Sequence, residues 1–186
     1  MWVDRQGRET PIPAPPRGYV YPRLSPDGTR VAVSANDQEQ DLWIWDLART
    51  TLTRATFEAA FDGYPVWTPD GRRVVFSSER AGARNLFWQA ADGTGAVERL
   101  SESPNTQNAT AVSPDGRRLI FTETAPKTGD DVMQMALDGT RPSTSSGRGE
   151  PVEPRRATPL VQSPFSERNG IVSPDGRWLA YEANDS

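Results

Sequence analysis

Short apolar runs of three to five residues recur along the chain, and polar segments rich in proline and glycine separate them. Four of these runs consist largely of β-branched, aliphatic and aromatic residues, at positions 30–34, 73–77, 118–122 and 178–182. Consecutive apolar residues in so short a run indicate strands that are covered on both faces. The 17 prolines and 15 glycines that interrupt the pattern argue against a helical fold.

One four-residue turn comes before each of these runs. Its copies are Ser25, Pro26, Asp27 and Gly28; Thr68, Pro69, Asp70 and Gly71; Ser113, Pro114, Asp115 and Gly116; and Ser173, Pro174, Asp175 and Gly176. Proline sets φ at the second position, aspartate accepts hydrogen bonds at the third, and glycine relaxes the exit. Four copies indicate an internal repeat, and we predict a structural role for these residues.

The positions around the turns predict four strands in each repeat. The first strand ends just before each turn, at Leu24, Trp67, Val112 and Val172. The third strand follows the run after the turn, at 42–45, 86–88 and 132–135. A fourth strand is marked by residues that lie 13 positions before the next turn, namely Ile12, Ala55, Leu100 and Leu160.

Four short strands in a repeat of 43 to 45 residues are typical of one blade of a β-propeller. A two-sheet sandwich is the alternative all-β fold, but sandwiches do not repeat in sequence. We therefore predict an all-β protein, a single β-propeller over 1–186 built from four-stranded antiparallel blades.

The expected parts are a half blade at 1–18, blades at 19–56, 57–101 and 102–162, and a half blade at 163–186.

The two half blades leave two arrangements open. Either the chain is a piece of a longer propeller, or its halves pair and close a four-bladed ring.

The third spacing between turns is 60 residues because the blade at 102–162 carries an insert at 142–156, which is rich in Ser, Pro, Gly and charged residues. We expect a disordered loop there, either a docking peptide or a tolerated surface insertion.

Composition removes several classes of function. The chain has 21 Lys and Arg against 25 Asp and Glu, a formal charge of −4, so it lacks the basic excess that nucleic-acid binding requires. It has no Cys and no His, which excludes disulfides, thiolate or imidazole metal sites and Ser-His-Asp triads. No apolar run approaches the ~20 residues that span a bilayer, so we expect no membrane insertion.

The acidic clusters do not predict a catalytic or metal site. Asp37, Glu39 and Asp41 match the start of a calcium loop, but Leu42 stands where that loop needs glycine and Ala48 where it needs glutamate. Asp130 and Asp131 are adjacent in a turn, where neighbouring side chains point in different directions. We predict no catalytic, cofactor-binding or metal-binding residue and no cofactor.

Two segments resemble the WD40-like repeats of TolB-type propellers: Leu-Ser-Pro-Asp-Gly-x-Arg-Val-Ala at 24–32 and Asp-Leu-Trp-Ile-Trp-Asp-Leu at 41–47. The stretches 41–49, 64–79 and 85–93 are most similar to the C-terminal propeller of bacterial serine/threonine protein kinases. No kinase signature is present. The resemblance implies a periplasmic or extracytoplasmic location, although the chain has no recognisable signal peptide.

These observations favour a non-catalytic module that binds a protein or peptide or acts as a sensor. The loops expected near the mouth of the propeller are 57–64, 103–108 and 165–170, and we predict Phe61, Tyr64 and Arg168 as contact residues. The alternative is a propeller that gates substrate access in a prolyl-oligopeptidase-like or tricorn-like peptidase, with the catalytic domain outside this chain. A carboxylate enzyme using Asp37 or Asp131 is a third hypothesis. Unpaired blade edges also predict self-association.

Overall fold

The computed structural model of the chain describes residues 1–37, 40–126, 129–137 and 155–184. The described residues form sixteen strands: β1 (Trp2–Val3), β2 (Glu9–Thr10), β3 (Tyr19–Leu24), β4 (Arg30–Ala35), β5 (Leu42–Asp46), β6 (Thr51–Arg54), β7 (Asp62–Trp67), β8 (Arg73–Ser78), β9 (Asn85–Ala90), β10 (Glu98–Arg99), β11 (Thr106–Val112), β12 (Arg118–Ala125), β13 (Gly129–Ala136), β14 (Ala157–Val161), β15 (Glu167–Val172) and β16 (Leu179–Ala183). They contain no helix long and apolar enough to cross a membrane.

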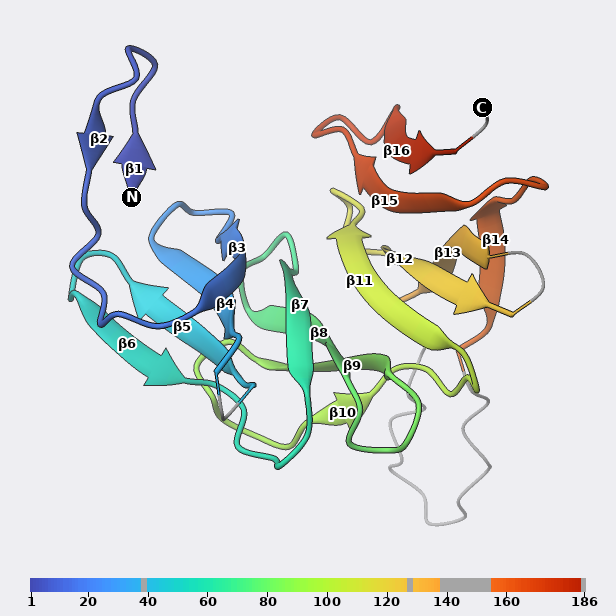
Figure 1. Cartoon of the computed structure of the whole chain (residues 1–186), viewed down its shortest axis with the longest axis horizontal. Coiled ribbons are helices and arrows are strands. Elements are labelled where there is room, and N and C mark those ends of the chain that lie inside the picture. Colours follow the sequence, from blue (N-terminus) through green and yellow to red (C-terminus); the bar gives the residue numbers. More distant parts are fainter. Residues whose placement is uncertain (38–39, 127–128, 138–154, 185–186) are drawn as a thin grey trace, which may run out of the picture.

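Three four-stranded antiparallel sheets follow one another along the chain. Their strand orders are β3-β4-β5-β6, β7-β8-β9-β10 and β11-β12-β13-β14, so each strand pairs with its neighbour in sequence. Two-stranded sheets, β1-β2 and β15-β16, lie before and after them. Figure 1 shows the sheets side by side along an open arc, with the two hairpins at opposite ends. The predicted all-β fold of a partial propeller is confirmed.

The two half blades do not pair with each other. Because β1-β2 and β15-β16 are separate sheets, ring closure into four blades is not what the structure adopts. The first strands end at Leu24, Trp67, Val112 and Val172, as predicted. The predicted insert at 142–156 lies outside the described residues up to position 154.

Each turn is closed in the same way. The Ser25 N–H donates to the Arg30 carbonyl at 2.8 Å, and the Gly28 N–H donates to the Ser25 carbonyl at 2.9 Å. The Ser25 hydroxyl accepts from the Arg30 N–H at 2.9 Å and donates to Asp27 Oδ1 at 2.6 Å. The glycine of every copy has a φ of 65 to 73°, a conformation that side chains disfavour.

The hydrophobic core lies between neighbouring sheets. Ala32, Leu42 and Ile44 of the first full sheet pack against Trp67, Phe76 and other residues of the second. A second cluster joins the next pair of sheets through Val75, Leu119 and Phe121, each fully buried. A smaller cluster links the third sheet to β15 and β16. Since each sheet buries its faces only against its neighbours, the repeats depend on stacking for stability.

Candidate interaction surface

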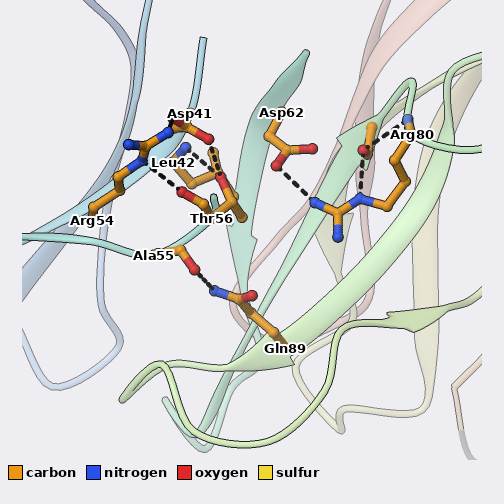
Figure 2. Close-up of polar contacts among 9 residues, drawn as sticks. Asp41, Leu42, Arg54, Ala55, Thr56, Asp62, Arg80 and Gln89 are labelled. Atoms are coloured by element: carbon orange, nitrogen blue, oxygen red, sulfur yellow. Dashed lines mark hydrogen bonds and ion pairs between the residues drawn. The ribbon is translucent and has the colours of Figure 1, made fainter. Parts of the chain in front are cut away.

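The loop at 57–61 leads from the outer strand β6 to the inner strand β7, and buried polar groups hold its first end. The N–H of Leu42 donates to the hydroxyl of Thr56 at 3.0 Å. That hydroxyl donates to Oδ1 of Asp41 at 3.1 Å, and Arg54 forms an ion pair with Oδ2 of Asp41 (Figure 2). Asp41 is fully buried, and this burial raises its pKa above the ordinary value although Thr56 and Arg54 act in the opposite direction.

A second buried carboxylate holds the other end of the loop. Asp62, the first residue of β7, is fully buried and forms an ion pair with Arg80 at 2.7 Å. Gln89 on β9 donates to the carbonyl of Ala55 at 2.6 Å and so joins the second sheet to the first (Figure 2). Both ends of the loop are therefore fixed at the interface between the first two full sheets. We call such an interface between neighbouring sheets a seam.

At the next two seams a hydroxyl also holds the loop, but there it bonds directly to the polar residue at the start of the inner strand. Ser101 follows β10, and its hydroxyl donates to the buried Gln107 at 2.5 Å. Ser163 follows β14, and its hydroxyl donates to the buried Glu167. We call these three sets of residues the loop anchors: Thr56 and Asp62 with their separate partners Asp41 and Arg80, Ser101 with Gln107, and Ser163 with Glu167. Sequence analysis missed them; the available signal was a polar residue five positions before the end of each of these first strands.

The inner strands have an unusual backbone where they leave the loops. Tyr21, Tyr64 and Asn169 each lie three residues before the end of a first strand, with φ of 54, 55 and 57°. A break in strand register accompanies each of them. Non-glycine residues with positive φ are uncommon and are concentrated at functional sites, which makes this part of the inner strands a candidate site.

Two of these residues form an aromatic cluster with Phe61. The rings of Tyr21 and Tyr64 are stacked at 4.2 Å, and their hydroxyls lie 3.1 Å apart. Phe61 lies 6.2 Å from Tyr64 in a tilted arrangement. Burial, followed by the hydrogen bond from Tyr21, raises the pKa of the Tyr64 phenol, so Tyr64 is neutral at physiological pH.

Arg84, the residue just before β9, completes this cluster. Its guanidinium lies 4.1 Å from the centre of the Phe61 ring and 5.7 Å from that of Tyr64. Glu79 accepts from Arg84 at 2.7 Å, and Asn108 on the next inner strand accepts at 3.3 Å. The cation is thus held in place over two aromatic rings. We call Tyr21, Phe61, Tyr64 and Arg84 the aromatic cluster.

The structure brings together two of the three predicted contact residues. Phe61 and Tyr64 touch within the aromatic cluster, whereas Arg168 lies on β15 and pairs with Glu182 at 3.0 Å. Asn169 also donates to Glu182, so Arg168 belongs to a second polar group at the C-terminal sheet. A role for all three in binding a partner stays a prediction.

Of the acidic residues considered above, Glu39 lies outside the described residues, and Asp37 forms an ion pair with Arg17 at 3.5 Å. Within the described ranges, no group of three or more metal-ligating side chains gathers in one place. Asp41 is engaged by Arg54, and Asp130 accepts a hydrogen bond from Thr124 at 2.6 Å. The surface at the aromatic cluster offers flat rings, a cation and hydroxyls, which are suited to binding and supply no nucleophile with a paired base.

The TolB beta propeller domain family matches residues 8–186. The chain is 28% identical to the uncharacterized peptidase YuxL of Bacillus subtilis over 88% of this chain and 29% of that protein. It is 39% identical to the TolB homolog of Chlorobium luteolum over 36% of this chain and 15% of that protein. The chain therefore spans less than a third of the length of these relatives.

Among solved structures, TolB from Acinetobacter baumannii is similar with a TM-score of 0.62. The match covers 89% of this chain and 43% of that one, at 19% identity, and shows a shared fold.

Proposed function

Because this chain belongs to the TolB β-propeller domain family, we propose that it is a non-catalytic module that binds a protein or peptide at the aromatic cluster. The observation that carries this proposal is the placement of Arg84 over Phe61 and Tyr64, where Tyr64 has a positive φ within the inner strand β7. Aromatic residues and arginine dominate the binding energy of protein interfaces. Loops fixed at both ends present such residues at low entropic cost.

Arg168, with Asn169 and Glu182, offers a second contact point on the C-terminal sheet. A partner that lies along the inner strands would contact the hydroxyls and rings of the aromatic cluster at one end and this charged group at the other. The partner is therefore expected to be an extended segment with an aromatic or cationic residue at one end.

The proposal is tested by selecting peptides from a random display library on the folded chain. We expect the selected peptides to lose about tenfold or more in affinity when Phe61 and Tyr64 are both changed to Ala, because two buried ring contacts are removed. The matched control is Phe57→Ala, an aromatic side chain that is 72% exposed in the same loop. Equal affinity of the selected peptides for the Phe61→Ala/Tyr64→Ala variant and the unchanged chain would overturn the proposal.

A second candidate function is supported by the similarity to YuxL, which extends over 88% of this chain. In this alternative the propeller restricts access to a peptidase domain encoded beyond these residues. Comparing hydrolysis of short and long peptides by the whole gene product separates the two: gating predicts that the Phe61→Ala/Tyr64→Ala change alters the length preference. Attachment to a kinase domain stays a prediction from resemblance alone, since the relatives named above are TolB and peptidase proteins.

A further inference from the structure

A groove of about 540 Å³ lies on the concave side of the arc, where the inner strands end and their turns begin. The inner strands β3, β7, β11 and β15 are neighbours around this space (Figure 1). Each of them contributes to the lining, which includes Arg23, Leu24, Val66, Ala111 and Ile171. We call it the turn-side groove.

The walls of the turn-side groove are largely apolar, and two aliphatic side chains in them are exposed. Leu24 on β3 is 51% exposed, and Ile171 on β15 is 54% exposed. Val66 and Ala111 line the same groove but are buried. Exposed aliphatic side chains that gather in one groove from strands far apart in the chain indicate a surface that binds apolar groups.

The charge of the turn-side groove is positive. Among the described residues that line it, Arg23 is the one charged side chain, and none is a carboxylate. Its guanidinium makes one long hydrogen bond, 3.4 Å to the carbonyl of Pro22, and no carboxylate or aromatic ring of the described residues engages it. Asp27, in the turn after β3, is held by Ser25 and Thr29. Unused arginine donors beside apolar walls favour an apolar ligand that carries a carboxylate.

The inner strands also present a backbone edge to the groove. In the part of the chain that the structure describes, β3, β7, β11 and β15 each lie at the end of a sheet and pair with one strand. A side-chain donor already reaches this edge, since Nε1 of Trp67 donates to the carbonyl of Arg23 at 2.8 Å. An extended peptide can form main-chain hydrogen bonds with such an edge, which favours a peptide over a small molecule.

We propose that the turn-side groove binds the carboxyl end of an extended apolar peptide, with the terminal carboxylate held by Arg23 and aliphatic side chains against Leu24 and Ile171. A terminal carboxylate brings one charge and leaves every side chain of the peptide apolar, which matches a groove with one cation. Arginine binds carboxylates through bidentate, charge-assisted hydrogen bonds. Contact with the two exposed aliphatic side chains removes apolar surface from water.

This site is separate from the aromatic cluster. Phe61 of that cluster directly precedes β7, whereas the turn-side groove is lined by the last residues of the same strand, Val66 and Trp67. Its test therefore does not depend on the proposed function.

The probe is a hexapeptide of alternating leucine and valine with fluorescein at its amino end, prepared as the free acid and as the carboxyl-terminal amide. Fluorescence anisotropy with the 186-residue chain should show about tenfold or more tighter binding of the free acid, because the amide lacks the charge that Arg23 recognises. Arg23→Gln should remove this preference. Leu24→Ser combined with Ile171→Ser should weaken the binding of both peptides.

Arg117→Gln is the matched control, because Arg117 is likewise an exposed arginine at the turn end of a sheet and does not line the groove. Thermal unfolding establishes that each variant is folded. Equal binding of the free acid and the amide would overturn the proposal, as would an unchanged preference in Arg23→Gln or an equal loss in Arg117→Gln. An amidated peptide ending in glutamate that binds as tightly as the free acid would show that a chain end is not what the groove recognises.

Discussion

At the scale of single residues, the repeated turn is stabilised by one hydroxyl and one carboxylate. Ser25 donates to Asp27, and Asp27 also accepts from the N–H of Thr29 at 3.0 Å. Both bonds end on Oδ1, and an ionised carboxylate accepts them more strongly than a protonated acid does. These contacts explain why Asp recurs in all four copies while the residue after glycine varies.

The turn carboxylates predict a measurable acid dependence. The hydrogen bond from Ser25, then those from Thr29, lower the pKa of Asp27 from 3.8 to about 2. Because the folded pKa lies below the unfolded one, the stabilisation is complete above about pH 4 and is lost as the pH falls toward 2. An NMR titration of the Asp27 carboxyl carbon checks the value. Asp27→Asn should reduce the loss of unfolding free energy between about pH 4 and pH 2. A midpoint near 3.8 would contradict this account of the turn.

At the scale of elements, the strands were predictable and their irregularities were not. Every first strand ends at the residue predicted from the turn. The proline of the turn fixes φ and has no N–H, so it cannot continue the hydrogen bonds of the sheet. Ala55 and Leu100 lie just beyond β6 and β10, yet their N–H groups still bond to Leu42 and Leu86. Ile12, predicted in the same column, lies two residues beyond β2.

The candidate site was only partly predictable. Phe61 and Tyr64 could be proposed because they lead into an inner strand, but the contact with Arg84 joins residues 20 or more positions apart that no periodicity connects. The left-handed backbone falls on Tyr21, Tyr64 and Asn169, whose side chains share no common signal. The loop anchors vary in residue type from seam to seam, so the sequence offered only the position of Asp62, Gln107 and Glu167, and their partners required the structure.

The first loop anchor makes a prediction through its partner Asp41. Asn85 occupies the same place in the second sheet, where its amide oxygen accepts from Arg99 at 2.6 Å. We therefore expect Asp41→Asn to fold normally, because Arg54 and Thr56 keep an acceptor. Asp41→Ala removes that acceptor and should lower the free energy of unfolding by about 2 kcal/mol.

Urea unfolding at two pH values measures both variants. Burial raises the pKa of Asp41, so the folded state holds its proton more firmly and the Asp41 contribution to stability falls as pH rises from 3.8 through the folded pKa. Asp41→Asn should remove this part of the pH dependence. An equal loss of stability in Asp41→Asn and Asp41→Ala would show that the charge, and not the acceptor, is required.

At the scale of the whole molecule, the seams differ in how much they bury. Among the described residues, nine form the buried cluster between the first two full sheets and nine form the cluster between the second and third. Three form the cluster that packs against β15 and β16. Trp178 and Tyr181 are 72% and 47% exposed on that last sheet. Packing between sheets therefore stabilises the middle of the arc most, and the C-terminal sheet exposes apolar surface.

This asymmetry predicts that the 186-residue chain, expressed by itself, self-associates through β16. In the part of the chain that the structure describes, β15 is the one strand that pairs with β16. The other side of β16 therefore offers backbone donors and acceptors next to exposed aromatic side chains. Tyr181→Lys should shift sedimentation velocity profiles toward monomer, because a charged side chain on an edge strand disfavours pairing. Phe57→Lys, which changes an aromatic residue that is even more exposed but lies in a loop, should leave the profile unchanged. A monodisperse, cooperatively melting monomer before any substitution would contradict the prediction, since it would mean that the middle seams alone keep the arc stable.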